Sequence, residues 1–452
     1  MNNLKPSGIE WIGSIPVDWK TVPIYYVAEE VTTKNKTLLR KNAFKFFFGN
    51  IINKPNFNPD EDNYVNKTIR NYIIVNPGDI VINGLNLNFD FVTKRVGMVT
   101  RPGTITSAYI SLRPKANVIL PKYMLYILRT YDSEKAFHNM GGGVRKILNY
   151  DELSKSKIIL PSISAQTRII KFLDKKVSQI DDISKKIQQE ITDLEAYRKS
   201  VITKTITKGL NPNVPMKDSG IEWIGKIPTD WSVIRLKYLG SAGNGLTYSP
   251  QNMTDESGTL ILRSSNIQHG EIVNADNVYV NSSVSKSLIL KKDDLLICSR
   301  NGSKDLIGKN ALINKEFIGS SFGAFMCVFR SKYNQYIYYV LNSNIFKFYV
   351  GSFLTSTINQ LTKHNLYNLA FPFPQKENER KQIIAFLKEK CENINHLITH
   401  KKDQLKLLNQ YKQSIIYEYV TGKKQVPTEE GAKEWEARLT NAMNINNTSL
   451  IN

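Results

Sequence analysis

Apolar residues recur at alternating steps of three and four positions in two long segments of the chain, residues 169–202 and 383–416. This spacing repeats every 3.5 residues and predicts two long helices, each with one apolar seam. The seam positions are Leu173, Val177, Ile180, Ser184, Ile187, Ile191, Leu194, Arg198 and Val201 in the first segment and Leu387, Cys391, Ile394, Ile398, Lys401, Leu405, Leu408, Lys412 and Ile415 in the second. One helix alone would leave its seam in water. We therefore expect the two helices to pair, and the long connection between them permits an antiparallel coiled coil.

Proline and glycine mark the ends of these helices. LPSISAQTR (160–168) and FPFPQKENER (371–380) predict strand-to-helix boundaries, because proline disfavours helix at the residue before it. The helices should end at Gly209 and Gly422. Beyond Pro427 the chain is polar and rich in asparagine, which indicates a short helix around KEWEARL followed by disorder.

The two regions before the helices, residues 20–158 and 232–370, alternate short β-rich runs with turn residues and predict mixed α/β structure. GDIVING (78–84) and DDLLICS (293–299) occupy equivalent places in these regions, and one helical pattern closes each region: PKYMLYILRTYDSEKAF in the first and NQYIYYVLNSNIFKFY in the second. The two regions should share one fold while their polar residues differ.

An internal repeat supports this division. Residues 7–19 (SGIEWIGSIPVDW) and 219–231 (SGIEWIGKIPTDW) are identical at 11 of 13 positions. The tryptophans of this box offer apolar anchors for a docking partner, and we take Trp11, Trp19, Trp223 and Trp231 as candidates. The alternative is a structural cap that begins each domain, since nothing in the box can perform catalysis.

Charge indicates the kind of partner. The chain carries 61 Lys+Arg and 40 Asp+Glu, a net charge of +21 and a pI near 9.5, which suits a polyanion. A merely Lys-, Asn- and Ile-rich composition is the alternative. The excess falls in the mixed regions: residues 20–150 hold 19 basic and 9 acidic residues, and 232–365 hold 14 and 8. This placement favours nucleic-acid contact by both regions.

Several classes of protein are disfavoured. Three scattered cysteines predict neither a disulfide framework nor a zinc site, and His396 and His400 have no visible third ligand, so we expect no metal. No signal peptide and no long apolar run is evident, which indicates a cytoplasmic protein without a membrane span. No methyltransferase string of the Asn-Pro-Pro-Tyr kind and no phosphate-binding GxxxxGK[ST] loop occurs, so we expect no catalytic residues.

Over residues 7–425 the chain resembles the specificity (S) subunit of bacterial and archaeal type I restriction-modification systems. The resemblance rests on the twin SGIEWIGxIPxDW boxes, PGDIVING with RVGMVT (95–100), GGGVRKILNYDEL (141–153) leading to LPSISAQTRIIKFL, and the second IIAFL helix. The chain departs from the family pattern at Ala165, where an acidic residue more often precedes Gln166. In that family the variable regions are target recognition domains and the repeated helices separate them.

The resemblance implies an α+β fold: two similar mixed α/β target recognition domains, joined by two long helices in an antiparallel coiled coil with a pseudo-two-fold repeat. The implied division is 1–158 (box and first recognition domain), 159–210 (first spacer helix), 211–370 (second box and recognition domain), 371–425 (second spacer helix) and 426–452 (tail). Two basic domains held apart by a rigid spacer would read two short half-sites of double-stranded DNA.

The resemblance also implies two methyltransferase subunits and restriction/translocase subunits as partners. S-adenosylmethionine, ATP and Mg²⁺ are then expected in those partners and no cofactor in this chain. A coiled-coil adaptor and an enzyme with unrecognised catalytic residues remain alternatives. Candidate DNA contacts are loop residues whose side chains match base edges or phosphates: Asn83, Asn86, Asn88, Lys94, Arg95, Arg145, Lys146, Arg263, Ser265, Asn266, Arg300, Asn301, Ser303, Lys304 and Lys309.

Overall fold

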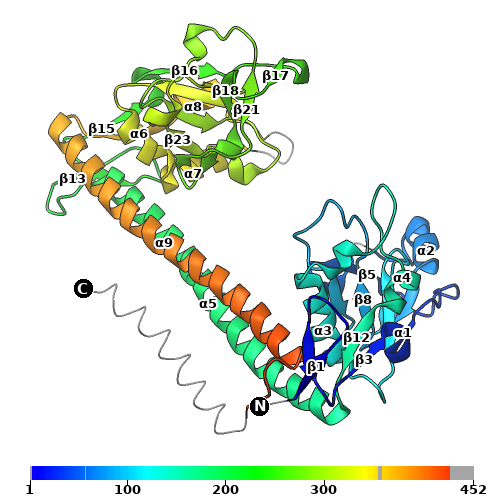
Figure 1. Cartoon of the computed structure of the whole chain (residues 1–452). Coiled ribbons are helices and arrows are strands. Elements are labelled where there is room, and N and C mark those ends of the chain that lie inside the picture. The colour runs from blue at the N-terminus through cyan, green and yellow to red at the C-terminus, as the bar shows by residue number, and fades with distance from the viewer. Residues whose placement is uncertain (1–2, 56, 355–358, 428–452) are drawn as a thin grey trace. The chain divides into compact units, whose positions relative to one another are not determined.

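The computed structural model describes residues 3–55, 57–354 and 359–427, and the predicted helix around KEWEARL lies outside them. Contacts within the chain divide it into two compact units. Ile187–Asp403 forms the second unit, and the described residues on either side of it in sequence form the first. Each unit holds one mixed domain and part of both long helices (Figure 1).

The two long helices are α5 (Ile163–Lys208) and α9 (Glu377–Val420), as the heptad spacing predicts. In the first unit the start of α5 pairs with the end of α9, where the ring centroids of Phe172 and Tyr419 lie 4.4 Å apart. In the second unit Lys401 of α9 forms an ion pair of 2.8 Å with Glu190 of α5. Both pairings are antiparallel, which confirms the predicted arrangement of the helices.

Glycines end both helices where the sequence predicts. Gly209 and Gly422 have φ values of +71° and +73°, in the left-handed region that a residue with a side chain rarely adopts. At Gly422 an added Cβ would also lie 2.5 Å from Pro16 of the first box. The helix end and the box therefore pack closely in the first unit.

Each box contributes the second strand of a small antiparallel hairpin, whose first strand directly precedes the box: β1 (Leu4–Pro6) with β2 (Ser14–Pro16), and β13 (Met216–Asp218) with β14 (Lys226–Pro228). Directly after each box a strand begins the mixed domain, and the last strand of the domain pairs with it. These pairs are β3 (Lys20–Pro23) with β12 (Lys157–Leu160), and β15 (Ser232–Arg235) with β26 (Ala370–Phe373). The two ends of each domain are thus adjacent.

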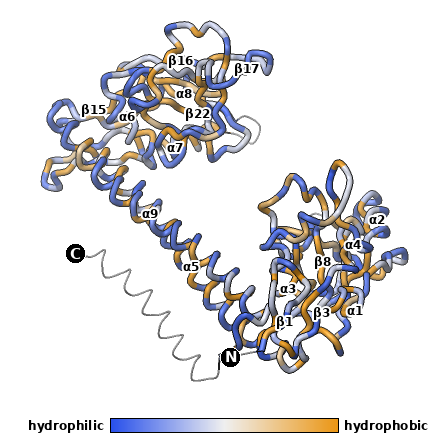
Figure 2. The backbone as a smooth tube through the Cα atoms, in the orientation of Figure 1, coloured by the Kyte–Doolittle hydropathy of each residue, from blue (hydrophilic) through white to orange (hydrophobic). Residues whose placement is uncertain are grey.

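Both domains are built on the same four-stranded antiparallel sheet. Its spatial order is β4 (Ala28–Glu30), β11 (Ile110–Pro114), β8 (Ile80–Ile82) and β9 (Val96–Met98) in the first domain, and β16 (Ser241–Asn244), β25 (Met326–Arg330), β22 (Leu295–Cys298) and β23 (Asn310–Leu312) in the second. The strands β8 and β22 come from the GDIVING and DDLLICS segments. Both are fully buried and are among the most hydrophobic parts of their domains (Figure 2).

The remaining strands of the described residues form two-stranded pairs and, in the second domain, another four-stranded sheet. They are β5 (Phe44–Phe47) with β6 (Asn50–Asn53), β7 (Ile73–Val75) with β10 (Gly103–Ile105), β19 (Ile267–Gln268) with β20 (Glu271–Ile272), and the set β17 (Met253–Thr254), β21 (Val278–Val280), β18 (Thr259–Leu262), β24 (Ser321–Phe322). The short helices are α1 (Ile24–Val27), α2 (Asn63–Arg70), α3 (Pro121–Ser133) and α4 (Tyr150–Lys155) in the first domain, and α6 (Asn334–Leu341), α7 (Asn344–Gly351) and α8 (Lys363–Asn368) in the second.

A buried carboxylate recurs at the start of the central strand. Asp79 forms an ion pair of 2.8 Å with Arg113, and Asp294 forms one of 3.0 Å with Arg330. Each carboxylate also accepts a hydrogen bond from the backbone N–H three residues earlier. This shared contact explains why GDIVING and DDLLICS keep an aspartate at the same place while the residues after the strand differ.

Candidate nucleic-acid interface

In the second domain the loop after β22 borders two hollows of about 610 and 630 Å³. Arg300 lines both hollows and is exposed. Its guanidinium lies over the ring of Phe325, 5.4 Å from the centroid, and donates no hydrogen bond to a described residue. Stacking on an aromatic ring orients the planar fork, so its donors are available for a guanine edge.

Other candidates gather at the same place. Arg263, Ser265 and Asn301 line the hollow of about 610 Å³ together with Arg300. The Asn301 amide donates to the Ser264 hydroxyl at 3.2 Å, and Lys309 Nζ donates to the Ser264 carbonyl at 3.1 Å. These bonds fix the loop that carries the candidates. Ser303 and Lys304 are exposed on that loop.

Asn266 is a correction to the sequence prediction. Its side chain is buried, and its amide donates to the carbonyls of Val273 and Ala275 at 3.3 and 2.7 Å. Its Oδ1 accepts from the Arg263 backbone N–H at 2.8 Å. Because these bonds use its donors and its acceptor inside the domain, Asn266 holds the turn in place and presents nothing to DNA.

In the first domain two loops form the corresponding surface. The Asn88 amide donates to the Val144 carbonyl at 2.9 Å, and the Lys146 backbone N–H donates to Asn88 Oδ1 at 3.2 Å. Asn86, Asn88 and Arg145 are exposed there. The Lys146 ammonium instead donates to the His138 carbonyl at 2.7 Å, and Asn83 Oδ1 accepts from the Leu85 N–H within a turn. The loops therefore present Asn86, Asn88 and Arg145 most directly.

Arg95 is a second correction. Its side chain is 0% exposed. Its guanidinium donates to the carbonyls of Asn83, Leu85 and Asp90 at 3.0, 2.8 and 2.6 Å. Burial lowers the pKa of Arg95, although the Asp90 charge opposes that effect. The side chain organises the loop from inside and cannot reach a base edge.

The box tryptophans divide into two kinds. Trp19 and Trp231 belong to the domain cores, and the Trp231 indole donates to Glu379 at 3.0 Å. For these two the docking prediction is wrong, because neither ring is accessible. Trp11 is half-buried against Tyr131, whereas Trp223 is 48% exposed. The box therefore acts as a structural cap with one exposed ring in its second copy.

Sequence reasoning missed several residues of these surfaces. Lys363 and His364 line the same hollow as Arg300, although they lie more than 60 positions later. Phe89, Val92 and Val144 are 73%, 84% and 92% exposed on the loops of the first domain. Exposed apolar side chains of this kind match the methyl group of thymine. No local pattern marks them, since apolar residues in the sequence first suggest a core.

Among the residues that the structure describes, no helix is long and apolar enough to cross a membrane. The same residues bring together no group of three His, Cys, Asp or Glu side chains able to hold a metal ion.

Comparison with known proteins identifies the family of the chain. The family model described as the type I restriction modification DNA specificity domain matches residues 16–193 and again residues 228–407. The chain therefore belongs to this family and contains two copies of its domain. Its role in the family is DNA sequence specificity.

Relatives match along nearly the whole chain. The type I restriction enzyme MjaVIII specificity subunit of Methanocaldococcus jannaschii is 24% identical over 424 residues, covering 91% of this chain and 94% of the relative. The putative MjaX specificity subunit of the same organism is 25% identical over 437 residues, covering 92% and 96%. A chain solved in work on complex assembly and conformational transition of the type I R-M system shares the fold, with a TM-score of 0.64, 13% identity and coverage of 91% and 99%.

Proposed function

We propose that the chain is the non-catalytic DNA-recognition subunit of a type I restriction-modification complex and that each mixed domain reads one half of a bipartite target. The observation that carries this proposal is the repeated sheet with different polar loops. Residues 83–95 follow β8 and residues 299–309 follow β22, at equivalent places on one scaffold. One scaffold with two different reading loops is what two unlike half-sites require.

The proposal extends to the partners. Two methyltransferase subunits would bind the chain, and restriction/translocase subunits would join the complex. These partners would supply catalysis and hold S-adenosylmethionine, ATP and Mg²⁺. The names of the relatives support a specificity subunit within such an enzyme. The exposed ring of Trp223 is a place where a partner could bury apolar surface.

Selection from random DNA duplexes tests the central claim. The full chain, assembled with its methyltransferase subunits, should enrich two short motifs separated by unspecified base pairs. The same motif should be found methylated in the host genome by methylation-aware sequencing. Enrichment of a single continuous motif, or of none, would contradict the proposal that two domains read two half-sites.

Arg300 should determine one half-site. Replacing it with alanine removes a donor fork held over Phe325 and should cost about 1–3 kcal/mol of binding to the target, with relaxed preference at one or two positions. Competition binding with a panel of singly substituted duplexes measures both effects.

The matched control is Lys292→Ala, an exposed lysine in the turn at the opposite end of β22. It removes the same formal charge and should leave the preference at every position unchanged. If Arg300→Ala weakened all duplexes equally and kept every base preference, Arg300 would be a backbone contact and no reader.

A further inference from the structure

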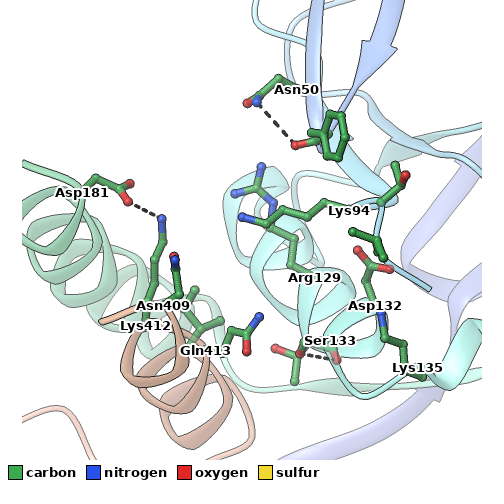
Figure 3. A pocket seen from close by; sticks show the side chains of 15 residues that line it. Asn50, Lys94, Arg129, Asp132, Ser133, Lys135, Asp181, Asn409, Lys412 and Gln413 are labelled. Atoms are coloured by element: carbon green, nitrogen blue, oxygen red, sulfur yellow. Dashed lines mark hydrogen bonds and ion pairs between the residues drawn. The ribbon is translucent and has the colours of Figure 1, made fainter. Parts of the chain in front are cut away.

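A hollow of about 390 Å³ lies within the first unit, between the mixed domain and the paired helices. The tip of the β5–β6 hairpin, the segment before β9, and α3 line one side. Residues of α5 and α9 line the other. In Figure 3 the Arg129 side chain extends toward the hollow from α3, and Lys412 and Gln413 face it from α9.

The hollow has an excess of positive charge. Lys94, Arg129, Lys135 and Lys412 line it, against two carboxylates, Asp132 and Asp181. Asp181 is already paired with Lys412 at 2.6 Å. Asp132 Oδ2 accepts a hydrogen bond of 2.7 Å from the Arg95 backbone N–H, and burial raises the pKa of Asp132. The carboxylates thus leave part of the positive charge uncompensated.

Lys94 is the cation without a partner. It forms no hydrogen bond or ion pair with any residue that the structure describes. Its pKa is lowered, chiefly by burial and further by the charges of Lys412 and Arg129. The negative charge of an anion in the hollow would raise the pKa of Lys94 and so oppose the effects of Lys412 and Arg129. The side chain is therefore suited to bind an anion.

Arg129 is held in place beside it. Its Nη2 donates to the Gly49 carbonyl at the hairpin tip at 3.1 Å, and its Nε donates to the Val96 carbonyl at 3.4 Å. The Nη1 group donates no hydrogen bond to a described residue. A fixed guanidinium with free donors next to a free ammonium can bind an oxyanion with little loss of side-chain freedom.

The second repeat also brings cations to a hairpin tip, although here they come from the long helices α5 and α9. Its β19–β20 hairpin turns at His269–Gly270, with φ values of +53° and +85°, as the β5–β6 hairpin turns at Phe48–Gly49 with +45° and +79°. Lys402 of α9 lies 3.2 Å from His269 Nε2. The pKa of His269 is lowered by burial and then by the charges of Lys402 and Arg198.

The helix residues also correspond by the repeat. With the offset of 214 residues, Lys412 and Asp181 align with Arg198 and Asn395. Both pairs bond across the helices, Lys412 to Asp181 and Arg198 to Asn395. A cation between hairpin tip and helix pair is therefore a feature of both repeats, each within its own unit.

We propose that these two cationic clusters, Lys94 with Arg129 in the first unit and Lys402 with Arg198 in the second, each bind a backbone phosphate of the DNA beside the half-site that the domain reads. This inference rests on the proposed function. Lys94 lies at the end of the loop that presents Asn86 and Asn88, so a duplex read by that loop would have its backbone within reach of Lys94. Phosphate contacts position a duplex without carrying sequence information.

Lys94→Ala and Lys402→Ala, made separately in the full chain with its methyltransferase subunits, test the inference. One lost phosphate contact should reduce the steepness of log K against log salt by about 0.9. The affinity deficit of each variant should therefore shrink about 3.5-fold between 50 and 200 mM salt, which follows from that slope. Base preferences should be unchanged, and Lys94→Glu should produce the larger loss.

Lys155→Ala is the control, an exposed lysine of α4 that lines none of the described hollows. Its salt slope should equal that of the unaltered chain. Normal DNA binding with an unchanged slope in both alanine variants overturns the inference and leaves the proposed function intact. Failure of the unaltered chain to bind any duplex would instead contradict the proposed function.

A further experiment distinguishes binding of a DNA phosphate from binding of a free anion. Inorganic phosphate is titrated against the unaltered chain and Lys94→Glu, with the thermal midpoint as readout. If phosphate stabilises only the unaltered chain while DNA affinity and salt slope are the same in both, the hollow binds a small anion, and the assignment to DNA backbone is wrong.

Discussion

Replacing Arg95 with methionine should lower the free energy of unfolding of the first unit by about 3–5 kcal/mol, because it removes one partner from a buried charged network. The guanidinium donates to four backbone carbonyls, those of Asn83, Leu85, Asn86 and Asp90, and lies 3.7 Å from the Asp90 carboxylate. Methionine keeps the length of the side chain and offers no donor. The carbonyls of Asn83 and Leu85 would then lose their donor, and the loop that carries Asn86 and Asn88 would lose much of its internal support.

Chemical denaturation of the full chain measures the change, with the transition of the first unit followed separately if the two units unfold apart. Arg145→Met is the control, since Arg145 is exposed on the adjacent loop and should change stability by less than about 0.5 kcal/mol. Equal effects of the two substitutions would show that the buried bonds of Arg95 contribute little. Specific binding through the first half-site should weaken with Arg95→Met, whereas preference at the other half-site should persist.

The sequence predicts the helices well because their signal is local and periodic. Each seam residue stands a fixed step from the next, and the partner helix only has to bury the same stripe. Even the polar interruptions have a structural use: Lys401 bonds to Glu190 and Arg198 bonds to Asn395 across the pair. Such bonds fix which residues face each other, a constraint that an all-apolar seam would leave looser.

The candidate site was predicted less completely because its geometry depends on contacts between distant segments. Lys94 and Arg95 are neighbours of similar chemistry, yet one lines a hollow and the other is fully buried. The difference arises from residues 83–90, whose carbonyls fold over Arg95. Lys363 joins the hollow of Arg300 in the same way, through tertiary structure that no spacing reveals. The loops were predictable as a group, whereas the role of each side chain was not.

Replacing residues 232–373 with a second copy of residues 20–160 should make the chain read the first half-site twice. The exchange is favoured by the pairing of the domain ends, Lys20 with Leu160 and Ser232 with Phe373, since a grafted domain enters and leaves at equivalent places. These strand pairs hold the two ends of each domain together before and after the graft. The reading loops therefore stay attached to their own sheet.

One contact between the grafted domain and the helices must be restored in the chimera. In the first unit Lys122 and the Tyr126 hydroxyl bond to Asp174 of α5 at 2.6 and 2.7 Å. The position equivalent to Asp174 in α9 is Lys388, which would face the grafted Lys122 with a like charge. The chimera should therefore carry Lys388→Asp, and the same chimera with Lys388 retained should have a lower thermal midpoint.

Methylation-aware sequencing of cells that express the chimera with its methyltransferase subunits identifies the site that it reads. Loss of the second half-site and its replacement by the first is the expected result, because base contacts reside in loops within each domain. The control is the single substitution Lys388→Asp in the otherwise unaltered chain, which should keep the original site. If the folded chimera still read the original second half-site, sequence preference would lie outside residues 232–373, in the helices or the boxes that the graft leaves unchanged.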